Sequence, residues 1–357
     1  MPMARSLSGG GSGGLLRPCA VGSDSSLLPS FLRVLLGYFS VTVFCQLFWV
    51  IPFISITMLS FLYRAYSLGQ LGATNATIAV VWFSLAFMPY KRWPWWSRVF
   101  RLWYEPFHVK TNLHTVNQSP PDPALKRSIV AMHPHGVIPL HSIIMSAIIE
   151  QYFPHMYGFA VAADVLLRLP LMRQVIGWLN TYGSTKQSLD KHLETKNMFI
   201  TLDGIRGIFL AKPGREVAVI NQRMGFFRLA MKHRARVVPV YVFGANEMWH
   251  NLTADENGLL GSLCRRLRMS IFCLFYGSFP WILPVPRFVP LTYAFGEDVD
   301  AAVLREQAMR ENPDASASEV DEAGACLLRD AYRASLISAF EKNKHEAGYA
   351  DRTLEIL

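Results

Sequence analysis

Two histidines stand on either side of a proline in His133-Pro134-His135-Gly136, and these residues suggest chemistry more directly than any others in the chain. An imidazole titrates near neutral pH, so it can take a proton from a hydroxyl group whose oxygen acts as a nucleophile. Proline fixes its own φ and biases the preceding residue toward extended geometry, which holds the two imidazoles in a stiff turn. Gly136 permits a positive φ or a close approach of another segment. The tetrapeptide therefore predicts a loop suited to general-base catalysis.

From the residues alone, two other interpretations of the histidine pair stay open: a structural pair, or part of a metal site. A protein metal site usually needs three or four ligands. No carboxylate or third ligand stands at metal-ligand spacing here, and His141, six residues after His135, has no motif around it. We therefore expect no metal and no resident cofactor. Because no serine or cysteine nucleophile motif is visible, we also expect the two substrates to react with each other directly, without a covalent enzyme intermediate.

The segments that must position this loop alternate between strand and helix patterns. Strands are predicted at 128–134, 197–202, 216–221, 236–244 and 290–296, and helices at 140–153, 164–179 and 225–234. This alternation is typical of an α/β fold with a mixed, mostly parallel sheet flanked by helices. Sites in such sheets lie beyond the carboxyl ends of strands, which is where the tetrapeptide stands. The amides of Val137 and Ile138, expected to open the next helix, would face a developing oxyanion.

Two segments near the C-terminus complete this part of the chain. The polar, acidic stretch 305–324 predicts an exposed excursion, and 326–344 predicts an amphipathic closing helix.

An uncharged run from Val34 to Tyr63 precedes the α/β part, and a shorter apolar run covers 76–90. The first run exceeds the ~20 residues that a ~30 Å hydrocarbon core requires, with a kink or break expected at Pro52. Basic residues outside both runs place the two flanks on the cytosolic side. The runs predict a transmembrane helical hairpin, although a second segment that only re-enters the bilayer stays open.

Four regions follow from these patterns. They are a disordered Gly/Ser-rich tail at 1–30, the membrane hairpin at 31–90, an interfacial segment at 91–111 and a catalytic domain at 112–357. The interfacial segment interleaves basic residues with tryptophans, as headgroup-level segments do; these are Lys91, Arg92, Arg98, Arg101, Trp93, Trp95, Trp96 and Trp103.

Composition and charge limit the class of partner. Hydrophobic residues make up 51% of the chain and charged residues 17%, below the roughly 25% of an average soluble domain, which favours membrane contact. The net charge of +9 suits nucleic acid, an anionic membrane or a phosphorylated substrate. No nucleic-acid motif is present, so we expect no nucleic-acid partner. A basic stretch at 204–236 is either a solvated or membrane-facing surface, or partly a grip for phosphates, with Arg223 and Arg228 as the candidates.

The tetrapeptide behind a hydrophobic hairpin resembles the type 2 diacylglycerol acyltransferase family, which also holds monoacylglycerol and wax-alcohol acyltransferases. Further blocks in the family's order strengthen the resemblance over roughly 34–351; they lie at 162–179, 223–247, 285–296 and 339–351. Position by position, the resemblance assigns His133, Pro134, His135 and Gly136 to the catalytic loop. It also assigns Arg223, Gly225, Phe226 and Arg228 to the family's RxGFxRxA block, where we expect substrate binding.

The resemblance implies a glycerolipid-acyltransferase-like fold and a membrane-bound, acyl-CoA-dependent O-acyltransferase. The expected reaction is that of an acyl-CoA:diacylglycerol acyltransferase, which makes triacylglycerol. The expected partners are acyl-CoA as co-substrate, an acylglycerol acceptor and the lipid bilayer, and a homo-oligomer stays open. The expected location is the endoplasmic reticulum membrane, with the catalytic domain and both termini cytosolic; the lipid droplet is the other expected location.

One block departs from the family pattern. Where the family usually reads PGGxxE, this chain has Leu202-Asp203-Gly204-Ile205-Arg206-Gly207, in which only Gly204 fits. The string from Asp203 to Arg206 resembles EGTR, the phosphate-gripping block of glycerolipid acyltransferases with an HxxxxD pair, so Gly204 and Arg206 join the expected substrate-binding residues. Two alternatives follow: the same chemistry on a monoacylglycerol, a long-chain alcohol or a lysophospholipid, or a catalytically reduced lipid-binding or lipid-droplet protein. Activity that appears in Gly207→Glu would favour the catalytically reduced lipid-binding or lipid-droplet protein.

Overall fold

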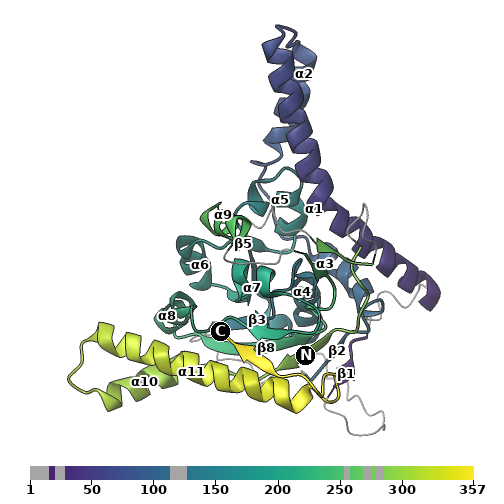
Figure 1. Ribbon diagram of the computed structural model, residues 1–357. Helices are drawn as coiled ribbons and strands as arrows, with labels where there is room; N and C mark the ends of the chain where they lie inside the picture. Colours follow the sequence, from purple (N-terminus) through teal and green to yellow (C-terminus); the bar gives the residue numbers. More distant parts are fainter. Residues whose placement is uncertain (1–15, 21–28, 113–126, 253–257, 268–274, 279–284) are drawn as a thin grey trace, which may run out of the picture.

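The computed structural model describes residues 16–20, 29–112, 127–252, 258–267, 275–278 and 285–357. Its architecture confirms the predicted α/β class, with a long apolar helix near the N-terminus and a mixed, mostly parallel sheet flanked by helices (Figure 1). Most of the predicted Gly/Ser tail lies outside the described residues. Its residues 16–20 do not form a free tail, because Arg17–Pro18 pairs with the sheet edge as strand β1.

Two apolar helices form the hairpin: α1 (Ser30–Ser67) and α2 (Ala73–Ser84). Pro52 lies inside α1 without ending it, so the expected break does not occur. Among the described residues, α1 is the one helix long and apolar enough to cross a membrane. The 12 residues of α2 reach only ~18 Å at ~1.5 Å each, short of a ~30 Å core. This length favours a second segment that re-enters rather than crosses.

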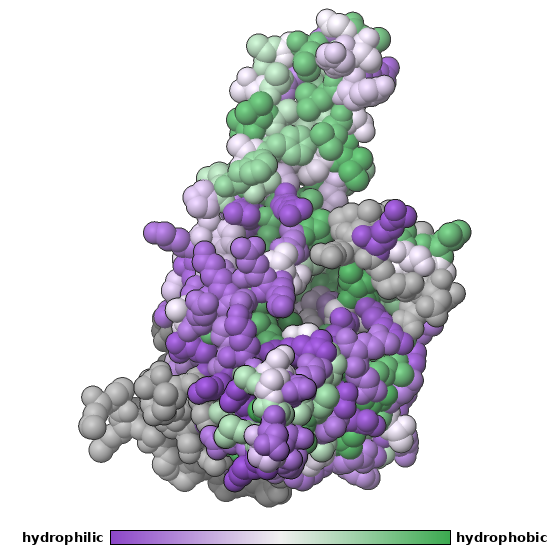
Figure 2. Space-filling model, turned by 90° about the vertical axis from the view of Figure 1, so that its left-hand side faces the viewer, coloured by the Kyte–Doolittle hydropathy of each residue, from purple (hydrophilic) through white to green (hydrophobic). Residues whose placement is uncertain are grey.

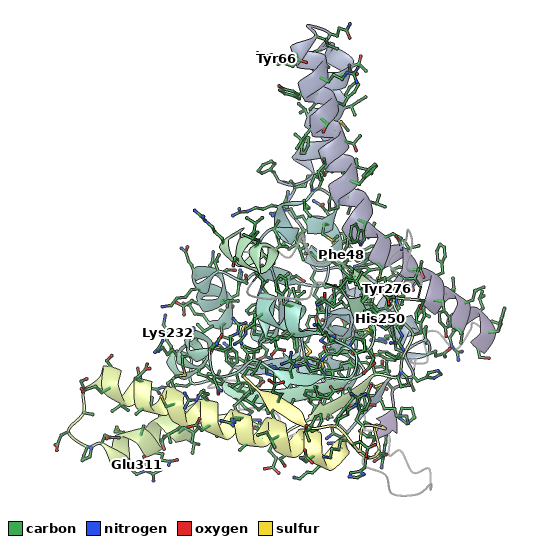
Figure 3. The ribbon with its side chains drawn as sticks, viewed as in Figure 1. Phe48, Tyr66, Lys232, His250, Tyr276 and Glu311 are labelled. Atoms are coloured by element: carbon green, nitrogen blue, oxygen red, sulfur yellow. The ribbon has the colours of Figure 1, made fainter. Side chains whose placement is uncertain are left out.

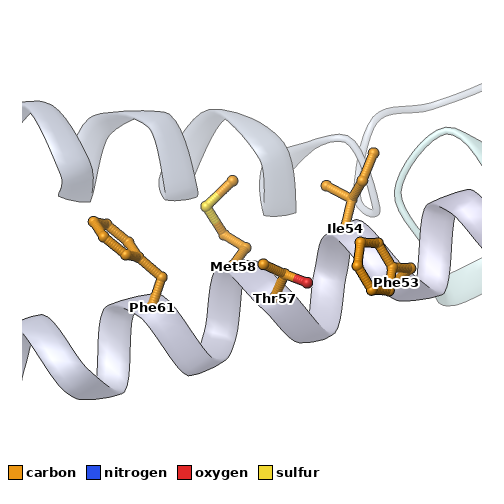
Figure 4. Close-up of a pocket in the computed structure, with 5 residues that line it drawn as sticks. All are labelled: Phe53, Ile54, Thr57, Met58 and Phe61. Carbon is orange, nitrogen blue, oxygen red and sulfur yellow. The ribbon is translucent and has the colours of Figure 1, made fainter.

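The hairpin stands away from the domain and presents apolar side chains to its surroundings. Phe53 is 70% exposed and Tyr63 is 75% exposed, and Tyr66 lies at the tip (Figure 3). The apolar hairpin contrasts with the largely polar body below it (Figure 2). A cavity of about 280 Å³ lies along α1, lined by Phe53, Ile54, Thr57, Met58 and Phe61 (Figure 4). This cavity belongs to the hairpin and not to the histidine loop.

The aromatic segment after the hairpin folds as α3 (Pro94–Val99) and η2 (Phe100–Tyr104). Trp93 and Trp95 are exposed. Trp103 differs, because it is fully buried and donates its indole N–H to Ser40 of α1. This segment therefore also attaches the hairpin to the domain core.

The main sheet has the strand order β1-β2-β11-β8-β3-β6-β4-β5, with β12 paired to β8. Five strands, from β8 to β5, run parallel, while β11 is antiparallel to β8. The bounds are β2 (Lys110–Thr111), β3 (Ser128–His133), β4 (Gly158–Ala162), β5 (Thr181–Gly183), β6 (Asn197–Thr201), β8 (Arg236–Phe243), β11 (Thr292–Phe295) and β12 (Val299–Asp300). The sequence missed β4 and β5, and β5 lies just beyond the predicted helix 164–179. Most of that stretch forms only the short η5 (Leu166–Arg168) and α5 (Met172–Gly177).

Alternating side chains of β3 enter two different cores. Val130 and Met132 pack with α4 (Leu140–Tyr152), whereas Ile129 and Ala131 pack with α8 (Met224–Lys232) and α11 (Ala317–Asn343). This division follows from the two-residue period of a strand, which sends successive side chains to opposite faces. The remaining helices around the domain are α6 (Lys186–Leu193), α7 (Gly204–Leu210) and α9 (Leu259–Leu267).

The predicted polar excursion at 305–324 is instead largely helical. It contains most of α10 (Ala301–Glu311) and the start of α11, which pack together as an arm with Glu311 at its outer end (Figures 1 and 3). Ser316 and Glu319 form a capping box that starts α11, a signal that the acidic composition concealed. The prediction of exposure is confirmed for this arm, while the closing helix begins nine residues earlier than the predicted 326.

Three shorter pieces complete the order of elements. The predicted strand 216–221 is reduced to β7 (Glu216–Ala218), which pairs with β13 (Leu354–Ile356) outside the main sheet. Strands β9 (His250–Asn251) and β10 (Phe275–Tyr276) form a separate pair, and η4 (Pro154–Met156) precedes β4.

Candidate active site

His133 is the last residue of β3, and its imidazole is fully buried on the face of the sheet covered by α11. The strand period explains the direction, because 129, 131 and 133 share one face. Nδ1 lies 2.7 Å from Oδ1 of Asp203, and Nε2 lies 2.9 Å from the hydroxyl of Tyr332. Both ring nitrogens therefore have protein partners, and the ring is fixed at both ends.

Asp203 stands between the end of β6 and the start of α7, and it is 1% exposed. Its Oδ1 accepts hydrogen bonds from Nδ1 of His133 and from the backbone N–H of Val219. Its Oδ2 is buried and has no hydrogen-bond partner among the described residues. A buried carboxylate keeps its charge only where donors surround it. The His133 imidazole and the Val219 amide both donate to Oδ1, whereas Arg223 donates to the backbone carbonyl oxygen of the same residue.

His135 is the other imidazole of the loop, and unlike His133 it keeps partial exposure. Its Nδ1 lies 2.9 Å from the carbonyl oxygen of Gly136. A carbonyl oxygen only accepts, so Nδ1 must carry the hydrogen of this bond, and in neutral imidazole the basic nitrogen is then Nε2. Burial lowers the pKa of His135 from its ordinary value, opposed by its bond to Gly136 and by the charge of Asp203. The ring is therefore neutral, with a basic nitrogen, at pH 7.

The loop that joins the two histidines to α4 depends on Gly136. Its φ is +67°, and a Cβ at this position would lie 3.2 Å from the carbonyl oxygen of Ala245. Glycine alone meets both conditions without strain. The helix begins at Leu140, with Val137 and Ile138 in a bend before it, so the prediction that their amides open the helix is wrong. The proline at 139 displaces the helix start.

Arg223 comes to the same place from the start of α8. Its guanidinium donates to the carbonyl oxygen of Asp203 and lies 3.1 Å from where a Cβ on Gly204 would stand. Gly204 has a φ of +58°, so a side chain there would be both strained and crowded. Burial lowers the pKa of Arg223; Asp203 opposes this effect and neighbouring Arg206 adds to it. The structure thus brings together Arg206, Arg223 and Gly204 beside the histidine loop.

The other residues of the RxGFxRxA block divide between the site and the surface. Phe226 is 9% exposed, and its ring centroid lies 6.5 Å from that of Tyr332, so it supports the residue that holds His133. Gly225 has open space where a Cβ would stand. Arg228 is exposed and pairs with Glu322 on α11 at 2.6 Å, so its side chain is not brought to the histidine loop.

A third imidazole, that of His141, lies next to the loop in the first turn of α4. Its side chain is fully buried, and neither ring nitrogen has a hydrogen-bond partner among the described residues. Burial, with a smaller effect of His135, lowers the pKa of His141 to about 3. This histidine is therefore an uncharged part of the core behind the loop.

Sequence reasoning did not find the two partners of His133. Tyr332 lies 199 positions away in a helix recognisable only as amphipathic, and nothing in its surroundings marks it. Asp203 did carry a signal, since it stands where the family pattern has a glycine. In the described part of the chain, no cluster of three or more histidine, cysteine, aspartate or glutamate side chains is arranged to hold a metal.

Comparison with known proteins bears on this arrangement. A model of the diacylglycerol acyltransferase family matches residues 76–356. Diacylglycerol O-acyltransferase 2 of Homo sapiens is 24% identical over 276 residues, covering 72% of this chain and 65% of the human protein. The protein of the same name from Danio rerio is 27% identical over 194 residues, covering 50% of this chain and 54% of the fish protein. Diacylglycerol O-acyltransferase 2-like protein 6 of Bos taurus is 27% identical over 165 residues, covering 42% of this chain and 49% of the bovine protein.

The matched region thus covers less than two thirds of the length of each of these relatives. The family match covers more than half of this chain and includes the histidine loop, the Asp203 turn and Tyr332. The chain belongs to the diacylglycerol acyltransferase family.

Proposed function

We propose that this protein is a membrane-bound acyl-CoA:diacylglycerol O-acyltransferase in which His135 is the general base. The observation that carries the proposal is the hydrogen bond from Nδ1 of His135 to the Gly136 carbonyl, which leaves Nε2 as the basic nitrogen of a residue that is only partly buried. His133 is not suited to this role, because it is fully buried and both nitrogens are engaged. The family match and the relatives' names support the acyl acceptor.

The chemical step is a direct transfer. Nε2 of His135 takes the proton of the acceptor hydroxyl while the hydroxyl oxygen attacks the thioester carbonyl carbon. As the tetrahedral intermediate collapses, the C–S bond breaks and the proton passes from His135 to the departing thiolate. The products are the ester, triacylglycerol, and free coenzyme A. No metal or resident cofactor takes part in this proposal.

Arg223 and Arg206 are proposed to hold phosphates of coenzyme A. Their guanidinium groups are close enough that Arg206 lowers the pKa of Arg223, an arrangement that an anion between them would relieve. The Nε of Arg223 is buried and has no partner among the described residues, so it has a donor to offer. Arg228, engaged with Glu322, is the weaker candidate of the three.

The hairpin is proposed to hold the domain on the cytosolic face of the endoplasmic reticulum or on a lipid droplet, where apolar acceptors dissolve. The exposed apolar surface of α1 and α2 supports this location. A monoacylglycerol, a long-chain alcohol or a lysophospholipid remains the alternative acceptor for the same chemistry.

The proposal is tested by measuring acyl transfer from labelled acyl-CoA to each of these four acceptor classes. The assays use membranes that carry the parent protein, His135→Ala or His155→Ala. His155 is an exposed histidine outside the loop, so its variant controls for the substitution itself. We expect diacylglycerol to be the preferred acceptor and His135→Ala to lose about 10²- to 10⁴-fold in kcat, the usual contribution of general-base catalysis. Parent-like turnover by His135→Ala would refute the mechanism, and preference for another acceptor would replace the substrate.

A further inference from the structure

The turn from β6 into α7 carries two positions that face the histidine loop, 203 and 207. They are four residues apart and so lie on one face of the helical turn. Asp203 reaches His133, and the Cα of Gly207 lies against both Asp203 and His135. This turn is the altered block of the sequence: it has Asp203 and Gly207 where the PGGxxE pattern of the family it resembles has a glycine and a glutamate.

The two replacements are linked by space. A Cβ on Gly207 would stand 2.3 Å from the Cβ of Asp203 and 2.9 Å from the Cβ of His135. Carbon atoms do not approach to 2.3 Å, so no side chain fits at 207 while Asp203 keeps its place. The 2.9 Å contact with His135 is less severe, and a shift of about 0.5–1.1 Å would bring it to the separation of ordinary carbon atoms. Removal of the Asp203 side chain would therefore remove the more severe of the two contacts and leave one that a small shift of the loop can relieve.

We propose that Asp203 is the positioning residue of this site, which supplies from position 203 the carboxylate that the altered block lacks at 207. The inference rests on the proposed function of the loop. Asp203 holds Nδ1 of His133, Tyr332 holds Nε2, and the short connection through Pro134 transmits this fixed orientation to His135. Gly207 is then a requirement of Asp203 and not a mark of lost activity.

Asp203 also acts through its charge. The carboxylate is buried, where a charge is poorly screened, and it favours the protonated form of His135. His135 becomes protonated as the acceptor oxygen attacks, so the negative charge stabilises that stage of the reaction. Loss of Asp203 should therefore affect kcat more than the KM for acyl-CoA, and it should change the pH dependence.

The first test is Asp203→Asn in the full-length protein in membranes, because this variant keeps the shape and removes the charge. Asp190→Asn is the matched control, since Asp190 Oδ1 also lies 2.7 Å from a histidine nitrogen, that of His233, but away from the loop. We expect Asp203→Asn to lower kcat about 10- to 100-fold, as loss of an orienting partner typically does, with the KM for acyl-CoA within about twofold. Its acidic limb of kcat/KM against pH should move to lower pH, because the removed charge raised the pKa of His135.

The second test measures the link between the two positions. Gly207→Glu alone should lose activity, because its side chain meets Asp203, whereas Asp203→Gly combined with Gly207→Glu should recover at least about tenfold over the single variant. The amount of each variant in the membrane and its thermal unfolding in detergent distinguish loss of chemistry from loss of fold.

Three results would overturn the inference. They are a parent-like kcat and pH profile for Asp203→Asn, a Gly207→Glu variant as active as the parent, or a double variant no better than Gly207→Glu. These outcomes are distinguishable from failure of the proposed function, which would appear as parent-like turnover of His135→Ala. An inactive His135→Ala with an unaffected Asp203→Asn overturns the role of Asp203 alone.

Discussion

The hydroxyl of Tyr332 lies 2.9 Å from Nε2 of His133, although the two residues are 199 positions apart in the chain. The contact joins the closing helix α11 to the end of the central strand β3, and the same hydroxyl lies 3.2 Å from the carbonyl oxygen of Ala131. One buried tyrosine thus holds the imidazole of His133 at the end opposite Asp203.

Tyr332→Phe removes this hydroxyl and keeps the ring. Nε2 of His133 is then buried without a partner, which costs about 1–3 kcal/mol of unfolding free energy. We expect a lower thermal midpoint in detergent and a lower kcat, because His133 is freed at one end. Tyr66→Phe, which removes the same hydroxyl at an exposed position, is the control. An unchanged midpoint and kcat in Tyr332→Phe would contradict the assigned hydrogen bond.

Gly136→Ala tests the backbone of the loop. The φ of +67° strains any L-residue by about 1–2 kcal/mol, and the new Cβ would press on the carbonyl of Ala245. We expect lower stability and lower turnover together. Gly225→Ala serves as the comparison for stability, since a Cβ there meets nothing within 4 Å. Equal unfolding midpoints for the two variants would show that the loop tolerates a side chain.

The activity of the parent should depend on pH through His135. Its pKa is lowered by burial, and the neutral ring is the active form. Activity should therefore persist as pH falls below the ordinary histidine value of about 6.5 and decline only at lower pH. The measurement is kcat/KM against pH with a buffer series of constant ionic strength. A decline with its midpoint above about 6.5 would contradict this assignment.

His141 should make the folded protein sensitive to acid. Its pKa is about 3 in the fold, against an ordinary value of about 6.5, so between these values the unfolded chain binds a proton that the folded chain does not. As the pH falls from about 6.5 toward about 3, this difference in proton binding lowers the free energy of unfolding by about 1.4 kcal/mol per pH unit. The midpoint of acid unfolding, measured by fluorescence, should lie at a lower pH in His141→Leu than in the parent. His155→Leu, at an exposed position, should leave the acid midpoint in place.

Arg223→Ala tests the phosphate site. Loss of a charge-assisted contact with a phosphate costs about 1.5–3 kcal/mol, so the KM for acyl-CoA should rise about tenfold or more. Arg310→Ala removes the same charge from the exposed arm and should leave this KM unchanged. The predicted effect should shrink when the substrate is an acyl thioester without nucleotide phosphates, and equal loss on both thioesters would assign Arg223 to the fold instead.

The sequence alone predicted the fold class, and it singled out the histidine loop as the candidate site. The α/β pattern was readable because helices and strands have different periods, and the apolar run of α1 because a bilayer demands length without charge. Local signals failed where elements are short. β5 has only three residues, β4 consists mostly of glycine and alanine, which are uncommon in strands, and the capping box of Ser316 and Glu319 lay hidden in an acidic stretch.

The sequence by itself determined which groups are available at the site: two imidazoles, held by a proline and a glycine at the end of a strand. The tertiary structure decided how they differ, with His133 buried between Asp203 and Tyr332 and His135 turned to keep a basic nitrogen. It also decided that a side chain at position 207 would collide with the side chain of Asp203. The physical reason is that burial and hydrogen-bond partners depend on segments brought together across 70 and 199 residues, which no local pattern encodes.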